Sequence, residues 1–360
     1  PQLGKAPIPA IIKAMTLEDK TKIVVGKGFA MFGGSAEVKP TDKNAAVSGH
    51  TVALPKFGIP TLDMADGPSG IHRFVMTKED SANNMFSTAW PVGTLLASSW
   101  DTTLVKKVGV AFGNEIKEYG IDFILGPAAN IHRNPLGGRN FEYYSEDPLV
   151  SGTIAAAMIN GIQSQGVGAT LKHFAANNQE TDRNAVNEII SERALREIYL
   201  RNFEIAIKKS QPWAVMTSYN LINGTYTSES HDLVTTILKD EWGFKGFVMT
   251  DWFGGKDAVA QMKAGNNLLM PGTTKQVNEI TDAVKNGQLS ESVLDKNAAG
   301  ILNVMLKAPT FKKFAYSNHP DLKANEQLSR EAAEERMVLL KNDLNTLPIK
   351  NTSETIALFG

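Results

Sequence analysis

The sequence contains no cysteine in its 360 residues. This absence excludes disulfide bonds, thiolate metal sites and a cysteine nucleophile. It does not assign a compartment, because many exported proteins also lack disulfides. The chain begins at Pro1 instead of an initiator Met, and this favours a secreted or periplasmic protein whose leader has been removed.

An excess of charge of one sign is also missing. The sequence has 37 Lys and Arg against 38 Asp and Glu, which gives a formal net charge of -1. Without a strong overall field, neither nucleic acid nor an anionic membrane is an expected partner. A charge-free run at 151–171 is long enough to cross a bilayer, but Gly, Asn and Gln interrupt it. We therefore expect a soluble protein in which this run is a buried amphipathic helix leading into a loop.

Several motifs with a known chemistry do not occur. The sequence has no G-x-G-x-x-G or G-x-x-x-x-G-K-[ST] turn for nucleotides, and no G-x-S-x-G string for a serine hydrolase. Its six histidines lie at no spacing typical of metal ligands. We therefore expect neither a metal nor a cofactor.

Short apolar runs alternate along the chain with longer helical patterns, which is typical of βα units and a parallel sheet. The helical patterns lie at 103–119, 191–208 and 233–241. The predicted strands lie at 61–64, 123–125, 169–171, 214–217, 246–250 and 268–270.

Polar residues follow four of these predicted strands. Asp66, Lys172, Ser218 and Asp251 each come at or just after the carboxyl end of an apolar run. In a parallel β/α barrel these ends converge on the face where active sites lie. An open doubly wound sheet would place ligands at only one or two such points. The pattern therefore favours an α/β protein with a (β/α)8 TIM-like barrel.

The character of the chain changes near residue 308. We predict a barrel over 1–308 and an irregular, basic linker over 309–323. A helical pattern follows at 324–340, and an apolar strand pattern lies at 355–360. Because a domain does not normally close on its first core strand, 324–360 is interpreted as the incomplete start of a second domain.

Each candidate site residue also has a plain structural interpretation. Asp251 could cap a helix, but Trp252 beside it suggests a carboxylate and an indole that face a sugar ring. Lys172 and His173 could be a surface lysine and a core histidine. The dense polar loop after them is better explained as a set of hydrogen-bonding groups for hydroxyls. Asp66 could be only a turn residue in Asp-Gly-Pro.

The chain resembles the barrel half of a glycoside hydrolase family 3 enzyme of the β-glucosidase type. The resemblance runs in order over nearly the whole sequence. It rests on 15–20, Asp66-Gly67-Pro68-Ser69-Gly70, 126–131, Arg139-Asn140-Phe141-Glu142, 145–148, Lys172-His173-Phe174, Ser218-Tyr219-Asn220, Asn223-Gly224, 246–252 and 338–342 before Leu347-Pro348.

The resemblance implies a retaining mechanism in which Asp251 is the catalytic nucleophile. It also implies that 324–360 begins an α/β sandwich domain. The sugar-binding residues that it implies are Asp66, Arg139, Lys172, His173, Arg183, Met216 and Tyr219, with Trp252 on the aglycone side. We further expect the positive groups around Asp251 to keep it ionised.

Two features depart from the family pattern. The family's Asp-Gly-Pro-x-Gly-x-Arg is one residue longer here, so either His72 or Arg73 could take the arginine's role. The acid/base of this branch is a Glu from the second domain, and it is expected outside this segment. The histidine that replaces it in the N-acetylglucosaminidase branch is also missing, because Ala175-Ala176-Asn177 follows Phe174.

The function expected from the resemblance is hydrolysis of terminal β-D-glucosyl residues from β-glucosides or cello-oligosaccharides. The xylose-specific branch has cysteines near positions 218 and 252, and their absence here favours glucose. Two alternatives stay open: a non-catalytic carbohydrate-binding barrel, and a β-xylosidase or mixed-specificity enzyme. The expected partners are the glycoside and the domain that supplies the Glu, and the oligomeric state is left open.

Overall fold

The computed structural model describes residues 1–28, 47–73, 86–350, 355 and 357. A six-stranded sheet lies at its centre, in the order β1-β2-β3-β4-β6-β9. Its strands are β1 (Gly49–His50), β2 (Asp63–Ala65), β3 (Phe123–Ile124), β4 (Gly168–Phe174), β6 (Ala214–Thr217) and β9 (Phe247–Met249). All neighbours are parallel except β1 and β2, which are antiparallel. A small second sheet contains β5 (Asn187–Glu188), β7 (Leu221–Ile222) and β8 (Thr225–Tyr226).

Two short segments close the six-stranded sheet into a ring. Leu268 forms a parallel bridge with Met249 of β9, and Leu269 forms one with Val25. The amide of Lys27 then donates to the carbonyl of His50 in β1 over 2.8 Å. Backbone hydrogen bonds therefore connect every neighbouring pair around the ring, and the structure is a TIM-like barrel with β1 as its antiparallel member.

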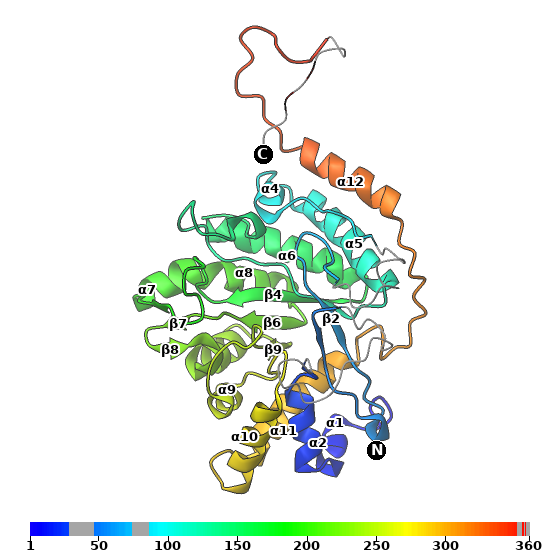
Figure 1. Cartoon of the computed structure of the whole chain (residues 1–360), viewed down its shortest axis with the longest axis vertical. Coiled ribbons are helices and arrows are strands. Elements are labelled where there is room, and N and C mark those ends of the chain that lie inside the picture. The colour runs from blue at the N-terminus through cyan, green and yellow to red at the C-terminus, as the bar shows by residue number, and fades with distance from the viewer. Residues whose placement is uncertain (29–46, 74–85, 351–354, 356, 358–360) are drawn as a thin grey trace.

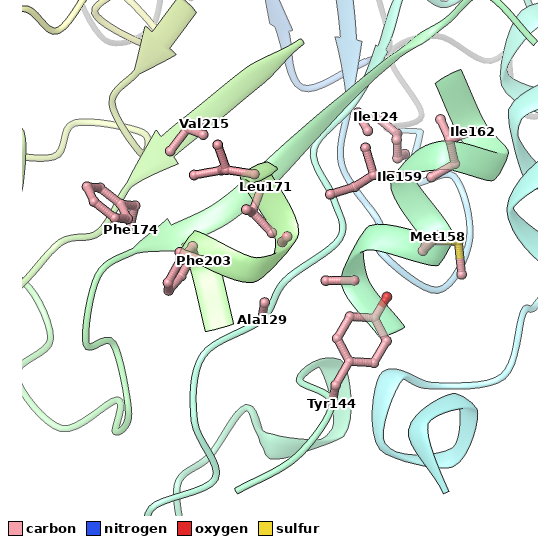
Figure 2. Close-up of a cluster of buried hydrophobic side chains, with 14 of the residues drawn as sticks. Ile124, Ala129, Tyr144, Met158, Ile159, Ile162, Leu171, Phe174, Phe203 and Val215 are labelled. Atoms are coloured by element: carbon pink, nitrogen blue, oxygen red, sulfur yellow. The ribbon is translucent and has the colours of Figure 1, made fainter. Parts of the chain in front are cut away.

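Alternation along the strands separates the inside of the barrel from the outside. Phe123 of β3 and Phe247 of β9 meet inside it, with ring centroids 5.6 Å apart. The strand residues that alternate with these inward-facing ones point the other way and pack under the helices (Figure 2). This outer layer includes Ile124, Leu171 and Val215 from the strands, and Ile159 and Phe203 from the helices.

Helices surround the barrel (Figure 1). On one side lie α4 (Gly93–Ala97), α5 (Thr102–Glu118), α6 (Pro148–Ser164) and α8 (Arg201–Ser210), which follows α7 (Glu192–Ala194) and η4 (Leu195–Tyr199). On the other lie α1 (Ile8–Ala14), α2 (Leu17–Val24), α9 (Ala258–Ala264), α10 (Thr274–Lys285) and α11 (Glu291–Met305). The remaining short turns are η2 (Pro55–Phe57), η3 (Asn140–Glu142) and η5 (Thr227–Glu229), and the longer η6 (Asp232–Glu241) is a π-helix.

Glycines allow α5 and α6 to approach closely. A Cβ on Gly161 of α6 would lie 2.4 Å from the carbonyl oxygen of Lys106 in α5. A Cβ on Gly109 of α5 would lie 2.7 Å from the carbonyl oxygen of Met158 in α6. The two backbones therefore touch where a larger residue would hold them apart.

The run at 151–171 contains the rest of a buried helix that begins at Pro148, a short turn and the first part of a strand. Its helix, α6, ends at Ser164, and after a short turn β4 begins at Gly168. The turn is possible because Gly166 adopts a positive φ of 81°. Across the residues that the structure describes, no helix combines the length and the hydropathy needed to cross a membrane.

The last helix, α12 (Leu322–Glu334), is shorter than the pattern at 324–340 predicts. It packs beside α4 and α5, where the Nδ2 of Asn325 donates to Glu115 over 3.0 Å. The apolar residues beyond it lie in solvent instead of on a helix face; Leu340, for example, is 92% exposed. The strand predicted at 355–360 lies almost wholly outside the described residues, and the division at 308 and 323 stays a prediction.

Candidate active site

A cavity of about 280 Å³ opens at the carboxyl ends of the barrel strands. Strand alternation explains much of its lining. Met64, Phe123 and Met249 point into the barrel, and the residues two positions later face the same way. These are Asp66, Leu125 and Asp251, all of which line the cavity.

The same rule alone would not place both Lys172 and His173 in the cavity, because adjacent strand residues point to opposite faces. The pairing between β4 and β6 shifts register between Leu171 and Phe174. Such an irregularity re-aims side chains at the end of a strand, and here both residues line the cavity.

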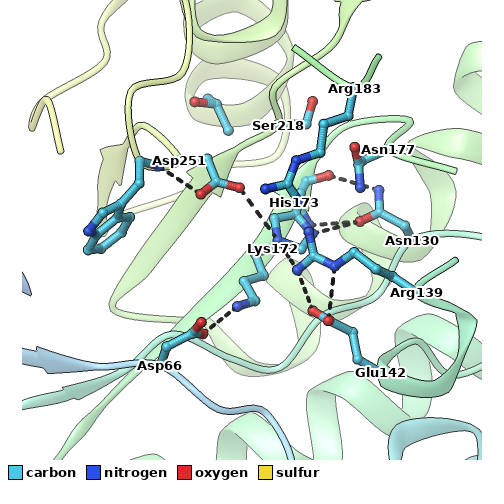
Figure 3. Close-up of polar contacts among 12 residues, drawn as sticks. Asp66, Asn130, Arg139, Glu142, Lys172, His173, Asn177, Arg183, Ser218 and Asp251 are labelled. Atoms are coloured by element: carbon cyan, nitrogen blue, oxygen red, sulfur yellow. Dashed lines mark hydrogen bonds and ion pairs between the residues drawn. The ribbon is translucent and has the colours of Figure 1, made fainter. Parts of the chain in front are cut away.

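Asp66 and Lys172 form an ion pair at one side of the cavity (Figure 3). The Nζ of Lys172 lies 2.8 Å from Oδ1 of Asp66. Burial acts to raise the pKa of Asp66, but Lys172, the backbone N–H of Gly67 and the charge of His72 together outweigh it, and the pKa is lowered below its usual value. Asp66 is therefore an acceptor at neutral pH, and Lys172 beside it is a donor.

Arg139 is held by two hydrogen bonds from its guanidinium to Glu142, over 3.0 and 2.9 Å. Its NH2 also lies 3.1 Å from Nε2 of His173. A guanidinium has no acceptor, so this ring nitrogen must be the unprotonated one. Burial, together with Arg139, Lys172 and Arg183, lowers the pKa of His173 well below its usual value. The histidine is therefore neutral.

Asp251 is 8% exposed at the floor of the cavity. Its Oδ1 accepts the backbone N–H of Trp252 over 2.7 Å, and the hydroxyl of Tyr219 also donates to the carboxylate. Its Oδ2 lies 3.6 Å from Nε2 of His173, but a neutral histidine with an unprotonated Nε2 makes no ion pair there. Asp251 itself lines the cavity, where a bound molecule would meet its carboxylate.

Positive neighbours and burial act in opposite directions on the pKa of Asp251. Lys172, Arg139, the N–H of Trp252 and the hydroxyl of Tyr219 all favour the ionised form. Burial has the larger effect and raises the pKa above its usual value. The positive groups limit this rise but do not reverse it.

Aromatic side chains form the remaining walls. The guanidinium of Arg183 lies 4.5 Å from the ring centre of Tyr219 and is tied to Glu180 over 2.9 Å. The indole of Trp252 is fixed by its Nε1, which donates to the carbonyl of Ser48 over 2.9 Å. An aromatic face beside a ring of donors and acceptors is suited to a neutral sugar.

All the residues predicted for the site line the cavity except His72 and Arg73. The amide of His72 donates to the carbonyl of Asp66, which lines the cavity, whereas the charge of Arg73 acts on Tyr119, which does not line it. Sequence reasoning missed Leu125 and Ser48. Alternation from Phe123 would have identified Leu125, but no sequence pattern marked Ser48. The described residues contain no group of three or more His, Asp or Glu that could hold a metal ion.

Comparison with known proteins identifies the family of this chain. Residues 59–304 match the model of the glycosyl hydrolase family 3 N terminal domain. Thermostable beta-glucosidase B of Acetivibrio thermocellus is 45% identical over 98% of this chain and 44% of its own length. An exo-alpha-(1->6)-L-arabinopyranosidase of Bifidobacterium longum is 40% identical over 97% of this chain and 45% of its own length.

A solved structure has the same fold. Beta-glucosidase 3B from Thermotoga neapolitana, in complex with glucose, superposes with a TM-score of 0.88 and is 50% identical. The match covers 94% of this chain and 48% of that one. This chain thus spans a little under half the length of the relatives that it matches. It belongs to glycosyl hydrolase family 3, whose N-terminal domain it contains.

Proposed function

We propose that this barrel carries the nucleophile of a retaining glycosidase that releases terminal β-D-glucosyl residues from β-glucosides or cello-oligosaccharides. The observation that supports this most directly is the setting of Asp251. Its carboxylate lies at the floor of the cavity, among Lys172, His173 and Tyr219. A barrel that only bound sugars would need no carboxylate at this place.

In the proposed reaction, a carboxylate oxygen of Asp251 attacks the anomeric carbon while the bond to the leaving oxygen breaks. Water then hydrolyses the glycosyl ester, which regenerates the carboxylate. The leaving oxygen needs a proton, and Asp66 is the only other carboxylate that the described residues bring to the cavity. Because its pKa is lowered, Asp66 is ionised at neutral pH and has no proton to give to the leaving oxygen. We therefore place the acid/base Glu in the further domain of the full-length relatives.

The names of the relatives support glucose as the sugar, because two of those compared are beta-glucosidases and one structure contains glucose. The arabinopyranosidase relative shows that specificity varies among proteins of similar sequence. A panel of β-glucosides, β-xylosides and α-L-arabinopyranosides would therefore rank the substrates.

The nucleophile is tested with 2,4-dinitrophenyl 2-deoxy-2-fluoro-β-glucoside and intact-mass measurement. Its leaving group departs without a proton, so the experiment does not require the acid/base residue. We expect a stable mass increase that maps to the peptide containing Asp251. Asp251→Asn should abolish it, because an amide is a far weaker nucleophile than a carboxylate.

Asp257→Asn is the matched control, because Asp257 caps α9 outside the cavity through bonds to Val259 and Ala260. This variant should still be labelled. A wild-type chain that binds glucose but gains no mass would contradict the proposal and favour a binding module. A variant Asp251→Asn that is labelled as fast as wild type would contradict the assignment of the nucleophile.

A further inference from the structure

The side chain of Asn130 contacts His173 at three points behind the cavity (Figure 3). Its Nδ2 donates to the carbonyl of His173 over 2.9 Å, and its Oδ1 accepts the backbone N–H of His173 over 2.9 Å. The same Oδ1 lies 3.3 Å from Nδ1 of the imidazole. Asn130 is buried, with 1% of its surface exposed, and does not line the cavity.

The two backbone contacts fix the orientation of the Asn130 amide. A backbone N–H can only donate and a carbonyl can only accept, so Oδ1 must face the N–H and Nδ2 the carbonyl. The imidazole Nδ1 therefore faces an amide oxygen that can only accept. A proton on Nδ1 satisfies this contact, whereas an unprotonated Nδ1 would face another lone pair.

The contact on the opposite side of the imidazole ring, at Nε2, favours the same tautomer. Nε2 faces the guanidinium of Arg139 over 3.1 Å, and a guanidinium can only donate. Arg139 is in turn held by two bonds to Glu142. A chain of hydrogen bonds thus runs from Asn130 through the imidazole to the cation that faces Asp251.

We propose that Asn130 is a positioning residue, which holds His173 in its Nδ1–H tautomer so that Nε2 accepts from Arg139 beside the nucleophile. The effect of Asn130 on the reaction rests on the proposed function. The tautomer itself is a property of the chain. A proton on Nε2 would instead point at the guanidinium of Arg139 or at Oδ2 of Asp251, which lies 3.6 Å away.

Other groups also face the imidazole. The hydroxyl oxygen of Tyr143 lies 3.4 Å from Nδ1 of His173, and it accepts a hydrogen bond from Asn177 over 3.0 Å. The charges of Lys172 and Arg183 act on the ring together with that of Arg139. Lys172 and Arg183 disfavour the imidazolium but do not select between the neutral tautomers. Arg139 at Nε2 and the amide of Asn130 at Nδ1 select the same tautomer from opposite sides of the ring.

The tautomer is tested by ¹⁵N NMR of the ring nitrogens in histidine-labelled protein, with His173→Gln used to assign the signals. Unprotonated and protonated ring nitrogens have widely separated shifts. In wild type at neutral pH we expect a protonated Nδ1 and an unprotonated Nε2. A proton on Nε2, in either the neutral or the charged ring, would overturn the proposal.

Two variants and a control separate positioning from stability. Asn130→Ala should give mixed tautomers, and Asn130→Asp should shift His173 toward the imidazolium, because a carboxylate would lie beside Nδ1. Asn297→Ala is the control, since it removes another buried amide, which donates to the carbonyl of Met262 over 3.0 Å. It should destabilise the fold without changing the His173 signals. Identical His173 signals in wild type and Asn130→Ala would overturn the role of Asn130.

The rate of labelling by the fluoroglucoside supplies the second measurement. Asn130→Ala should be labelled at least tenfold more slowly than wild type, whereas Asn297→Ala should stay within about twofold. A changed tautomer with an unchanged rate would overturn the positioning role. If wild type itself is not labelled, the proposed function fails, and the NMR result still decides whether Asn130 sets the tautomer.

Discussion

At the scale of single residues, burial and charge act against each other on the two carboxylates of the cavity. Both are penalised by burial, yet the pKa of Asp66 is lowered and that of Asp251 is raised. The difference arises because Lys172 contacts Asp66 directly over 2.8 Å, whereas it acts on Asp251 only from a greater distance. One lysine therefore helps to set the ionisation of both groups.

Lys172→Met should shift the pH dependence of labelling. The nucleophile must be ionised, so the rate falls as the pH drops through the raised pKa of Asp251. Lys172 lowers that pKa, so its removal should raise the pKa further and move the acid limb of the rate profile to higher pH. The measurement is the rate of labelling by the fluoroglucoside between about pH 4 and 8.

Lys239→Met is the matched control for this shift. Lys239 is also largely buried, and burial lowers its pKa to about 8, but it bonds Asn267 and the carbonyl of Gly265 away from the cavity. The acid limb of the labelling-rate profile of Lys239→Met should coincide with that of wild type. An acid limb in Lys172→Met that stays in place or moves to lower pH would show that the lysine does not control Asp251.

At the scale of helices and strands, the sequence predicted long elements better than short ones. The helix predicted at 103–119 is α5 (Thr102–Glu118). The prediction is close because the apolar spacing and the N-cap residue, Asp101, both indicate the same helix. β1 and the segment that contains Val25 had no apolar run long enough to recognise. They belong to the barrel because of their hydrogen bonds to distant strands, which local sequence cannot reveal.

The candidate site shows the same limit. Asp66, Lys172 and Asp251 stood out because each followed an apolar strand. The tie between Asn130 and His173 joins residues 43 positions apart, and nothing local in either segment indicates it. The sequence therefore predicted which side chains line the cavity better than which groups hold them in place.

The close contact between α5 and α6 gives a prediction at this scale. Gly161→Ala should lower the free energy of unfolding by about 1–3 kcal/mol, because its Cβ would press on backbone that cannot move aside. Urea denaturation measures the change. Lys106→Ala, an exposed substitution on α5, is the control and should change stability by less than about 0.5 kcal/mol. Equal stabilities for Gly161→Ala and wild type would contradict the close contact.

At the scale of the whole molecule, Glu115 joins parts of the chain that are far apart in sequence. It is fully buried on α5, where it accepts the N–H of Thr88 over 2.8 Å and the amide of Asn325 in α12 over 3.0 Å. Burial raises its pKa above the usual value of 4.5, although these hydrogen bonds oppose the rise. The folded state therefore holds this proton more tightly than the unfolded chain does.

This linkage gives a pH dependence with a definite sign. Between the usual and the raised pKa of Glu115, the folded state binds more protons than the unfolded one, so stability falls as the pH rises through that window. Glu115→Gln should remove this part of the slope. Urea unfolding at several pH values from about 4.5 upward measures it.

Glu279→Gln, on the outer face of α10 beside Lys275, is the control and should keep the wild-type slope. If stability in wild type and in Glu115→Gln varies equally with pH over the window, Glu115 is not responsible for the dependence.

The closure of the barrel has a consequence for how the protein is made. Residues 24–27 pair with Leu269 and with β1, although Leu269 is synthesised more than 240 residues after Val24. At about 5–20 residues per second, the first part of the ring waits roughly 12–50 s for its neighbour to leave the ribosome. During that time the apolar side chains of α2 and of the unfinished ring are open to other nascent chains. We therefore expect the yield of this protein to depend on translation speed and chaperones as well as on the stability of the finished barrel.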